Sequence, residues 1–382
     1  MNTRRNRIQA SRRRPYALGA ALTGVALVAT ACGGSSAGSG EGDELTLTFS
    51  SALAPDTAVN QQAQWYMDKV TELTDGRVQW DTYYAGALLS STETVTGVAD
   101  GRADMAYFAS AYDPGTLPLL DIGFVPVTDT DSVGNALAWR DLYESNEALQ
   151  QETANAGIHI LFMNGVANLS NVAMPEKVAS VSELEGKQIR VIGAASAAVE
   201  SLGASPVSLA AEEIYESVER GVIGGIGGTS IESVIGQGYE EVAPWMHYLP
   251  FGNYGSSLGV IMGENRWNDL PPEVQDAFEK ATEAYYEELP TMLAAGEEEA
   301  CDALLEAGGG VVILPSDDAE KAAVVEAVGD APMQIWRDNA KRSGASEQSI
   351  AQIEKAYTET ARSLAGTADY TPGEQLCAAR SE

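Results

Sequence analysis

The stretch LTLTFS, residues 45–50, begins an alternation of strand and helix signals that decides the fold class. Its apolar and polar side chains alternate, as expected of a strand with one buried face. Pro55-Asp56-Thr57 then begins a helix that ends at Gly76. The same order continues with a strand at 78–84, a helix at 91–98 and a strand at 103–108. Strands separated by helices predict an α/β fold with mixed, mostly parallel sheets.

The rest of the chain repeats these signals and adds a long helix. We expect a helix at 132–156, strands at 158–163 and 188–192, and a helix at 194–202. Residues 271–305 carry the strongest helical stripe, and Pro290 inside it predicts a kink. About 340 residues follow the N-terminal leader, which is more than one hydrophobic core usually serves. We therefore expect two lobes.

The N-terminal leader has the composition of an export signal. Six arginines lie within residues 4–14, and the apolar run 17–31 is shorter than the roughly 20 residues that span a bilayer. Small residues, Cys32 and a Gly/Ser tract follow, an order that resembles a bacterial lipoprotein leader. We predict a signal peptide at 1–31, then acylated Cys32 with its tether at 32–43. The chain would be anchored to the outer face of the cytoplasmic membrane, in the periplasm or cell-wall space.

Two questions about the leader stay open. An ordinary secretory signal could end beside a cysteine by chance, which would leave the protein without a lipid. Export could also follow the general or the twin-arginine route, because Ser11-Arg12-Arg13 matches the latter only weakly.

The charge balance excludes several classes of partner. The leader holds six of the 23 basic residues and none of the 55 acidic ones, so the remaining chain carries a net charge near −38. Such a chain is repelled by nucleic acid, whose binding needs basic surfaces. It is also repelled by anionic bilayers. We therefore expect no nucleic-acid partner, and membrane contact only through the lipid anchor.

No catalytic or metal-binding constellation is visible in the sequence. The two histidines, His159 and His247, lie far apart, and no zinc, nucleophile-elbow or phosphate-loop motif occurs. The glycine cluster at 221–228 lacks the lysine of a phosphate cradle, which favours a flexible or close-packed loop. We expect no catalytic residue, metal or cofactor. An exported two-lobed chain of this kind is suited to capturing a small solute.

Several motifs, in a fixed order, carry a resemblance to a known family. The chain resembles the DctP-type solute-binding proteins of tripartite ATP-independent periplasmic (TRAP) transporters over residues 45–365. The matching segments are TDGRV (74–78), YAGAL (84–88), GRADM (101–105), LEGKQIRV (184–191), LGASPV (202–207), EIY (213–215), RGVI (220–223) and WNDLP (267–271).

The resemblance implies a two-lobed periplasmic-binding-protein-like fold of the Venus flytrap type, with a long kinked helix that bridges the lobes. It implies capture of a small organic solute and delivery to a permease with small and large membrane subunits, driven by an ion gradient. We assign residues 44–165 and about 230–255 to lobe I, and 166–229 and about 256–315 to lobe II. Residues 316–382 would form a helical segment that packs back on both lobes.

The resemblance also assigns one ligand-binding residue. The arginine at the position of Arg190 forms a salt bridge with the carboxylate of the bound acid in this family. A planar guanidinium suits that task because it offers two parallel donors and stays charged. The competing interpretation is an arginine that ends a strand by pairing with a nearby glutamate.

Three departures from the family pattern concern the same site. A second family arginine is replaced at Ala167, the ligand-binding asparagine is replaced at Gly228, and an aromatic residue near Ala211 is missing. These losses predict a larger or less polar site, suited to a bulkier monocarboxylate or a neutral solute. Substitute polar groups could come from Asn168, Ser170, Thr229 and Ser230.

Two tyrosines are candidates for the opposite wall of the site. Tyr84 and Tyr107 lie near the ends of predicted first-lobe strands, where α/β proteins form their ligand sites. Packing in a half-buried position is the alternative role for either ring.

Cys301 and Cys377 remain once Cys32 is set aside, and an even number of cysteines in an exported chain can pair. A disulfide would join the C-terminal segment to the helix that carries Cys301; two unpaired thiols are the alternative.

Two other functions stay open at this stage. The protein could be an anchored binding module that serves a sensor or another transporter class. It could also be an extracytoplasmic enzyme, although no motif supports one.

Overall fold

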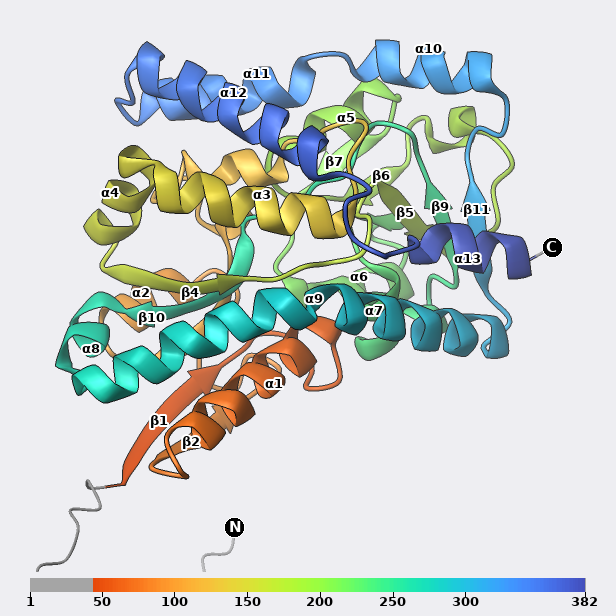
Figure 1. Ribbon diagram of the computed structural model, residues 1–382. Coiled ribbons are helices and arrows are strands. Elements are labelled where there is room, and N and C mark those ends of the chain that lie inside the picture. The colour runs from red at the N-terminus through yellow and green to blue at the C-terminus, as the bar shows by residue number, and fades with distance from the viewer. Residues whose placement is uncertain (1–43, 382) are drawn as a thin grey trace, which may run out of the picture. The chain divides into compact units, whose positions relative to one another are not determined.

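The computed structural model describes residues 44–381 (Figure 1). The predicted signal peptide, Cys32 and the tether up to residue 43 lie outside the described residues. The described strands form two mixed sheets, each covered by helices, as the α/β prediction requires.

The first sheet has the strand order β2-β1-β3-β10-β4. β1 pairs in parallel with β2 and β3, while β10 is antiparallel to both β3 and β4. All six residues of β10 are buried, which is consistent with its place between two other strands. The strands are β1 (Leu45–Ser50), β2 (Val78–Tyr83), β3 (Met105–Ala109), β4 (Ile158–Met163) and β10 (Leu258–Gly263).

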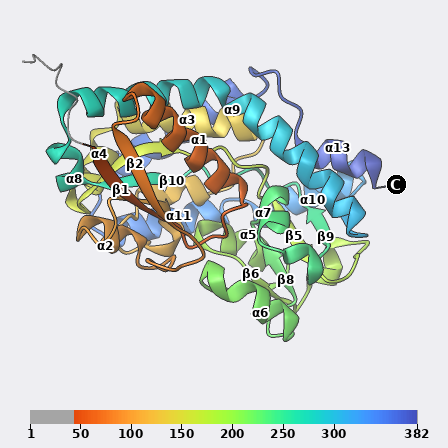
Figure 2. The same cartoon turned by 90° about the horizontal axis from the view of Figure 1, so that it is seen from below.

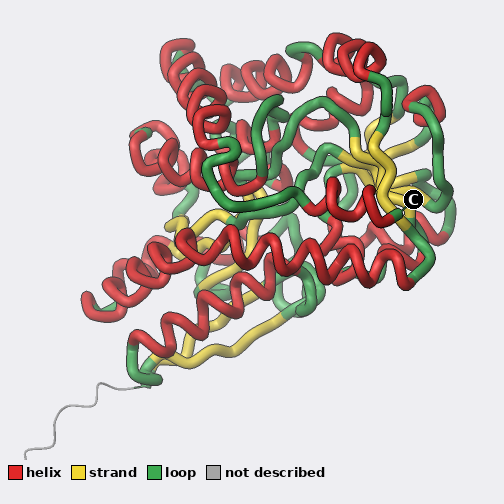
Figure 3. The backbone as a smooth tube through the Cα atoms, turned by 45° about the vertical axis from the view of Figure 1, so that its right-hand side comes forward, coloured by secondary structure: helices red, strands yellow, loops and turns green. Residues whose placement is uncertain are grey.

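The second sheet has the order β11-β9-β5-β8-β6-β7, in which three of five pairings are parallel. Its strands are β5 (Asn171–Met174), β6 (Gln188–Arg190), β7 (Ser205–Val207), β8 (Gly225–Gly227), β9 (Trp245–Tyr248) and β11 (Gly310–Ile313). The two groups of strands are separate in the tube view of Figure 3.

Helices cover both sheets. Residues 132–156, expected as one helix, form two, because the side chain of Asn146 accepts hydrogen bonds from the backbone N–H groups of Ala148 and Leu149 and so begins α4. The helices are α1 (Ala58–Leu73), α2 (Thr94–Ala99), α3 (Ser132–Ser145), α4 (Glu147–Asn155), α5 (Ser196–Ser201), α6 (Ile214–Glu219), α7 (Ile231–Gly236), α8 (Glu264–Asp269), α9 (Pro272–Glu306), α10 (Asp318–Val328), α11 (Ala331–Arg342), α12 (Glu347–Leu364) and α13 (Gly373–Arg380).

The long helix α9 serves both sheets. It continues through Pro290 over 35 residues, and Figure 2 shows it passing along both parts of the molecule. Phe278 and Tyr285 pack in the core beside the first sheet, whereas Cys301 and Leu304 pack in the core beside the second. The side chains of Thr282 and Tyr286 bond backbone groups of β4, Leu161 and Met163. The helix therefore covers the outer edge of β4 as well as bridging the two sheets.

The chain crosses between the sheets by three routes: residues 164–170, residues 249–257, and α9. The first two crossing segments are bonded to each other and to neighbouring backbone. Asn164 N–H donates to Leu258 O at 2.9 Å, and Leu249 N–H donates to Ser170 O at 2.7 Å. We call these two segments the interlobe segments.

The sheets distribute two segments differently from the predicted lobes. The sequence placed 230–255 in lobe I and 256–315 in lobe II, whereas β9 belongs to the second sheet and β10 to the first. The apolar run of β10 completes the buried centre of the first sheet, and β9 pairs with β5. No change in local composition marks such a crossing, so the sequence did not reveal it.

The C-terminal segment is helical and returns across the molecule. α12 packs beside α3, and α13 lies against α9 and β11 (Figure 1). Cys301 of α9 and Cys377 of α13 form a disulfide, as the cysteine count had suggested. No helix among residues 44–381 combines the length and apolar character needed to cross a membrane.

Candidate functional site

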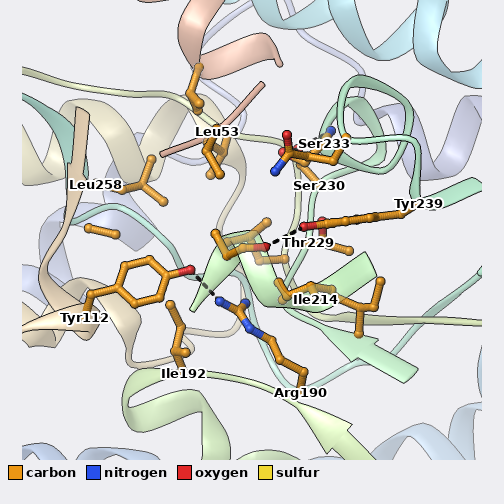
Figure 4. Close-up of a pocket in the computed structure, with 18 of the residues that line it drawn as sticks. Leu53, Tyr112, Arg190, Ile192, Ile214, Thr229, Ser230, Ser233, Tyr239 and Leu258 are labelled. Carbon is orange, nitrogen blue, oxygen red and sulfur yellow. Dashed lines mark hydrogen bonds between the residues drawn. The ribbon is translucent and has the colours of Figure 1, made fainter. Parts of the chain in front are cut away.

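A pocket of about 90 Å³ lies between the two sheets. Its wall is mostly apolar and includes side chains from both sheets and from the interlobe segment 164–170. Figure 4 shows most of these side chains converging on one space. The lining residues that carry polar groups are Tyr107, Tyr112, Arg190, Thr229, Ser230, Ser233, Gln237 and Tyr239.

Arg190 ends β6 and directs its side chain into this pocket (Figure 4). It is 4% exposed. The guanidinium donates to Leu209 O from Nε at 3.3 Å and from Nη2 at 3.2 Å, and Nη2 also donates to the Tyr112 hydroxyl at 2.5 Å. No carboxylate of residues 44–381 lies within ion-pair distance. This result contradicts the alternative of a strand-end pair with a glutamate.

The positive charge of a buried arginine is not neutralised when the arginine lacks an acidic partner. Removing a charge from water is costly unless an opposite charge or several good hydrogen bonds compensate it. The neutral oxygens of Leu209 and Tyr112 accept hydrogen bonds from some of the guanidinium N–H groups. They do not neutralise its positive charge. The arrangement is suited to an anion that brings its own charge and two acceptor oxygens.

Four tyrosines lie within electrostatic reach of Arg190: Tyr107, Tyr112, Tyr239 and Tyr254. Burial raises the pKa of Tyr239 to about 12 and that of Tyr107 further, although Arg190 opposes both shifts. The hydroxyl groups of Tyr107 and Tyr239 therefore remain neutral at physiological pH. They can donate hydrogen bonds to an anion without adding negative charge.

The first turn of α7 supplies smaller hydroxyl groups. Ser230 caps this helix, because its Oγ accepts from Ser233 N–H at 3.2 Å. Gln237, at the other end of α7, accepts a hydrogen bond from Ala54 N–H at 2.8 Å. This bond joins the loop after β1 of the first sheet to the end of α7. Thr229 and Ser230 follow β8 and face the pocket (Figure 4).

Three of the five predicted binding residues line this pocket: Arg190, Thr229 and Tyr107. The other two lie elsewhere. Asn168 sits in an interlobe segment and donates to Glu374 Oε1 at 2.9 Å. Tyr84 packs edge-on against Phe49, with ring centroids 6.0 Å apart, in the packing role that was its alternative.

The sequence did not single out Tyr112 and Tyr239 as site residues. Tyr112 lies three residues beyond β3, and Tyr239 follows α7, so chain folding brings them to Arg190 from distant positions. Tyr112 could have been predicted as a site residue from its position just after a strand of the first sheet. No local spacing relates Tyr239 to the site.

The departures from the family pattern do not leave empty space. Gly228 has φ +67°, and a Cβ placed on it would lie 2.5 Å from the Tyr254 hydroxyl oxygen. Ala167 is 1% exposed and is not among the residues that line the pocket. Tyr254 occupies the space beside Gly228, and the wall of the pocket is mostly apolar, as the prediction of a larger or less polar site allows.

Neither histidine contributes to the pocket. His247 Nε2 accepts from Val178 N–H at 3.0 Å inside the second sheet's core, and His159 stacks on Trp267 with ring centroids 4.1 Å apart. Among residues 44–381, no group of three His, Cys, Asp or Glu side chains is arranged to hold a metal ion.

Two α/β sheets joined by three crossings, with a cationic pocket between them, define a two-lobed ligand-binding protein. Residues 49–338 match the family model of the bacterial extracellular solute-binding proteins, family 7 (DctP). The chain therefore belongs to this family, which confirms the resemblance found in the sequence. Its members are solute-binding proteins of transport systems and are not classed as enzymes.

Known relatives agree with this assignment. A monocarboxylate 2-oxoacid-binding periplasmic protein of Nostoc sp. is 26% identical over 295 residues, which is 75% of this chain and 77% of the relative. Among solved structures, a TRAP periplasmic solute-binding protein of Desulfovibrio salexigens has a TM-score of 0.65 and 23% identity, covering 85% of this chain and 98% of that one. A TRAP solute-binding protein of Rhodoferax ferrireducens, solved with copurified benzoate, has a TM-score of 0.71 and 18% identity, covering 84% and 100%. These structures share the two-lobed fold.

Proposed function

We propose that this chain captures a small organic monocarboxylate between its two lobes and delivers it to a TRAP-type permease with a small and a large membrane subunit. The observation that carries this proposal is Arg190, which is buried in the pocket and has no acidic partner within residues 44–381. One guanidinium matches one carboxylate, and no other Lys, Arg or His of the described residues lines this pocket. A second carboxylate on the ligand would face apolar side chains and hydroxyl groups.

The apolar lining favours a ligand with a small uncharged body. Leu53, Val59 and Phe124 face the pocket from one side, and Ile192 and Ile214 from the other. The Nostoc relative is named for 2-oxo monocarboxylates and the Rhodoferax structure holds benzoate, so both concern acids with a single carboxylate. The hydroxyls of Tyr107 and Thr229 could accommodate a 2-oxo group beside the carboxylate.

The strongly negative net charge does not prevent anion binding. Charges on the solvated surface are screened within about 8 Å at physiological salt. Arg190 would act at contact distance inside a closed, low-dielectric pocket, where attraction is several times stronger than in water. Ligand contacts made only by the closed lobes would then shift the population toward the form that meets the permease.

Isothermal titration calorimetry with residues 44–382 tests this proposal. The panel would contain pyruvate, longer 2-oxo monocarboxylates, benzoate and the corresponding neutral amides, applied to the wild type and to Arg190→Ala. We expect an acid to bind the wild type, its amide to bind far more weakly, and Arg190→Ala to lose binding. Arg220→Ala is the matched control, because Arg220 is exposed, is paired with Glu216 and does not line the pocket. Equal affinity of an acid for the wild type and for Arg190→Ala would overturn the proposed role of Arg190.

We also propose that acylated Cys32 anchors this receptor beside its permease. The leader order of arginines, apolar run and cysteine supports this anchor. In a host fed a labelled fatty acid, the full-length wild type should incorporate label and fractionate with membranes. Cys32→Ser should remain unlabelled and appear in the soluble exported fraction. Labelling of Cys32→Ser would contradict the assignment.

A further inference from the structure

Three buried glutamates meet beside an interlobe segment, outside the ligand pocket. Glu297 on α9 is 0% exposed, Glu232 on α7 is 6% exposed and Glu374 on α13 is 8% exposed. They come from three different helices, and their carboxyl groups repel one another electrostatically. We call these three residues the carboxyl cluster.

Uncharged groups surround the carboxyl cluster on each element that packs against it. Glu297 accepts from the Tyr370 hydroxyl at 2.5 Å and from Gly373 N–H. Glu374 accepts from Asn168 at 2.9 Å, and the Ser230 hydroxyl interacts with Glu232. Tyr248 of β9 also faces all three carboxyls. No Lys, Arg or His of the described residues is among the groups that act on the three glutamates.

The hydrogen bonding of the cluster is incomplete. Among the described residues, the Tyr248 hydroxyl, 3% exposed, has no hydrogen-bond partner, and neither do Oε2 of Glu232 and Oε2 of Glu374. Buried polar atoms of this kind are costly unless they are paired. Because the described residues offer no metal-binding arrangement, the negative charge is most simply cancelled by protons. Burial and mutual repulsion both raise the pKa values of Glu232 and Glu297, and burial raises that of Glu374.

The carboxyl cluster also links the C-terminal helix α13, the interlobe segment 164–170 and the helix α7 beside the ligand pocket. Glu374 joins the C-terminal helix to Asn168 of an interlobe segment. Glu297 holds the turn before that helix to α9. Glu232 lies two residues beyond Ser230, which lines the ligand pocket. We infer that Glu232, Glu297 and Glu374 carry protons when they are packed together and form a pH-sensitive latch that holds the C-terminal helix against the interlobe segment.

The direction of the pH effect follows from proton linkage. A carboxyl whose pKa is raised in the latched form binds its proton more tightly there than in the open form. The latched form is therefore favoured at low pH, and opening releases a proton as the pH rises toward the raised pKa. Each proton released makes the opening equilibrium up to tenfold more favourable per pH unit. This effect concerns the interlobe segment itself and does not depend on which ligand the pocket takes.

Hydrogen–deuterium exchange of the ligand-free protein between pH 5.5 and 8.5 tests the latch. After correction for the intrinsic pH dependence of exchange, we expect the opening of residues 164–170 and 373–380 to become at least tenfold more favourable across this range. Amides of β10, in the centre of the first sheet, should change little. The wild type alone can overturn the inference, if these two segments show no more pH dependence than β10.

Two variants sharpen the test. Glu232→Gln keeps the side-chain shape, leaves the contacts of Glu297 and Glu374 in place and removes one repelling group. It should flatten the pH profile and keep both segments protected at pH 8.5. Glu298→Gln is the matched control, because Glu298 is the exposed neighbour of Glu297 on the same helix. A Glu232→Gln profile as steep as that of Glu298→Gln would overturn the latch.

Discussion

Arg190 of the second sheet donates a 2.5 Å hydrogen bond to the hydroxyl of Tyr112, which follows the first sheet's strand β3. The two lobes are therefore connected through the residue proposed to hold the ligand. The Tyr112 ring also lies near the guanidinium, whose Cζ is 5.7 Å from the ring centroid. In the ligand-free chain, this tyrosine occupies one of the donors that a carboxylate would use.

Tyr112→Phe should lower the free energy of unfolding of the ligand-free chain by about 1 kcal/mol, because it removes a hydrogen bond to a charged group and keeps the ring. Urea denaturation followed by circular dichroism measures this change. Tyr107→Phe is the control, since the structure gives the Tyr107 hydroxyl no hydrogen-bond partner among the described residues. Equal losses in the two variants would show that the Tyr112 hydroxyl has no special role.

Gly228→Ala should cost about 2 to 3 kcal/mol of stability. The left-handed backbone at φ +67° disfavours any Cβ by about 1 kcal/mol, and that Cβ would lie 2.5 Å from the Tyr254 hydroxyl. Tyr254→Phe removes the oxygen and leaves the next ring atom at 3.4 Å, an ordinary contact.

A double-mutant cycle separates the two causes. In the Tyr254→Phe background, the cost of Gly228→Ala should fall to about 1 kcal/mol, the backbone contribution alone. Additive losses would mean that Tyr254 does not explain the glycine at this position.

The sequence predicted those features that depend on short stretches of chain. The family resemblance pointed to Arg190 as a ligand-binding residue and to a helix that bridges the lobes, whereas the alternation at 45–50 and the stripe at 271–305 directly indicated a strand and a long helix. Their signals lie within one element, where periodicity and composition are direct consequences of burial.

Features that depend on chain crossings were not predictable in the same way. Tyr112 and Tyr239 reach Arg190 from elements far away in the sequence, and β10 enters the first sheet after the chain has built most of the second. The carboxyl cluster joins residues 232, 297 and 374 in a chain with 55 acidic residues. In such a chain, only the fold distinguishes three buried glutamates from solvated ones.

Asp121→Asn should stabilise the protein increasingly as the pH rises from about 4 to 8. Asp121 is 1% exposed, neither of its carboxyl oxygens has a hydrogen-bond partner in the described part of the chain, and burial raises its pKa to about 8. The unfolded chain releases this proton near its ordinary pKa, so ionisation favours unfolding throughout that window. The asparagine removes this penalty.

Thermal unfolding of Asp121→Asn and wild type at several pH values measures the effect. The stability difference should grow toward pH 8, reach about 1 to 3 kcal/mol, and then level off. Asp100→Asn, at an exposed position, should show no such trend. A constant difference between Asp121→Asn and wild type would mean that Asp121 does not titrate in this range.

Removing the disulfide should release the C-terminal helix before the rest of the protein unfolds. Cys301 and Cys377 are 76 residues apart, and closing a loop of this size restricts the unfolded chain by about 4 kcal/mol in the entropic model. Both cysteines are buried, and the double variant Cys301→Ala/Cys377→Ala removes only one sulfur atom from each side chain in the core.

Denaturant unfolding of the double variant should show a loss of about 2 to 4 kcal/mol, and wild type in excess reductant should lose a similar amount. Limited proteolysis would locate the loss. Cleavage should begin in residues 365–381 while the two sheets remain intact, because the disulfide, Glu297 and Glu374 all secure this segment. If reductant leaves the wild type unchanged while the double variant is destabilised, the cost belongs to side-chain packing and not to the covalent bond.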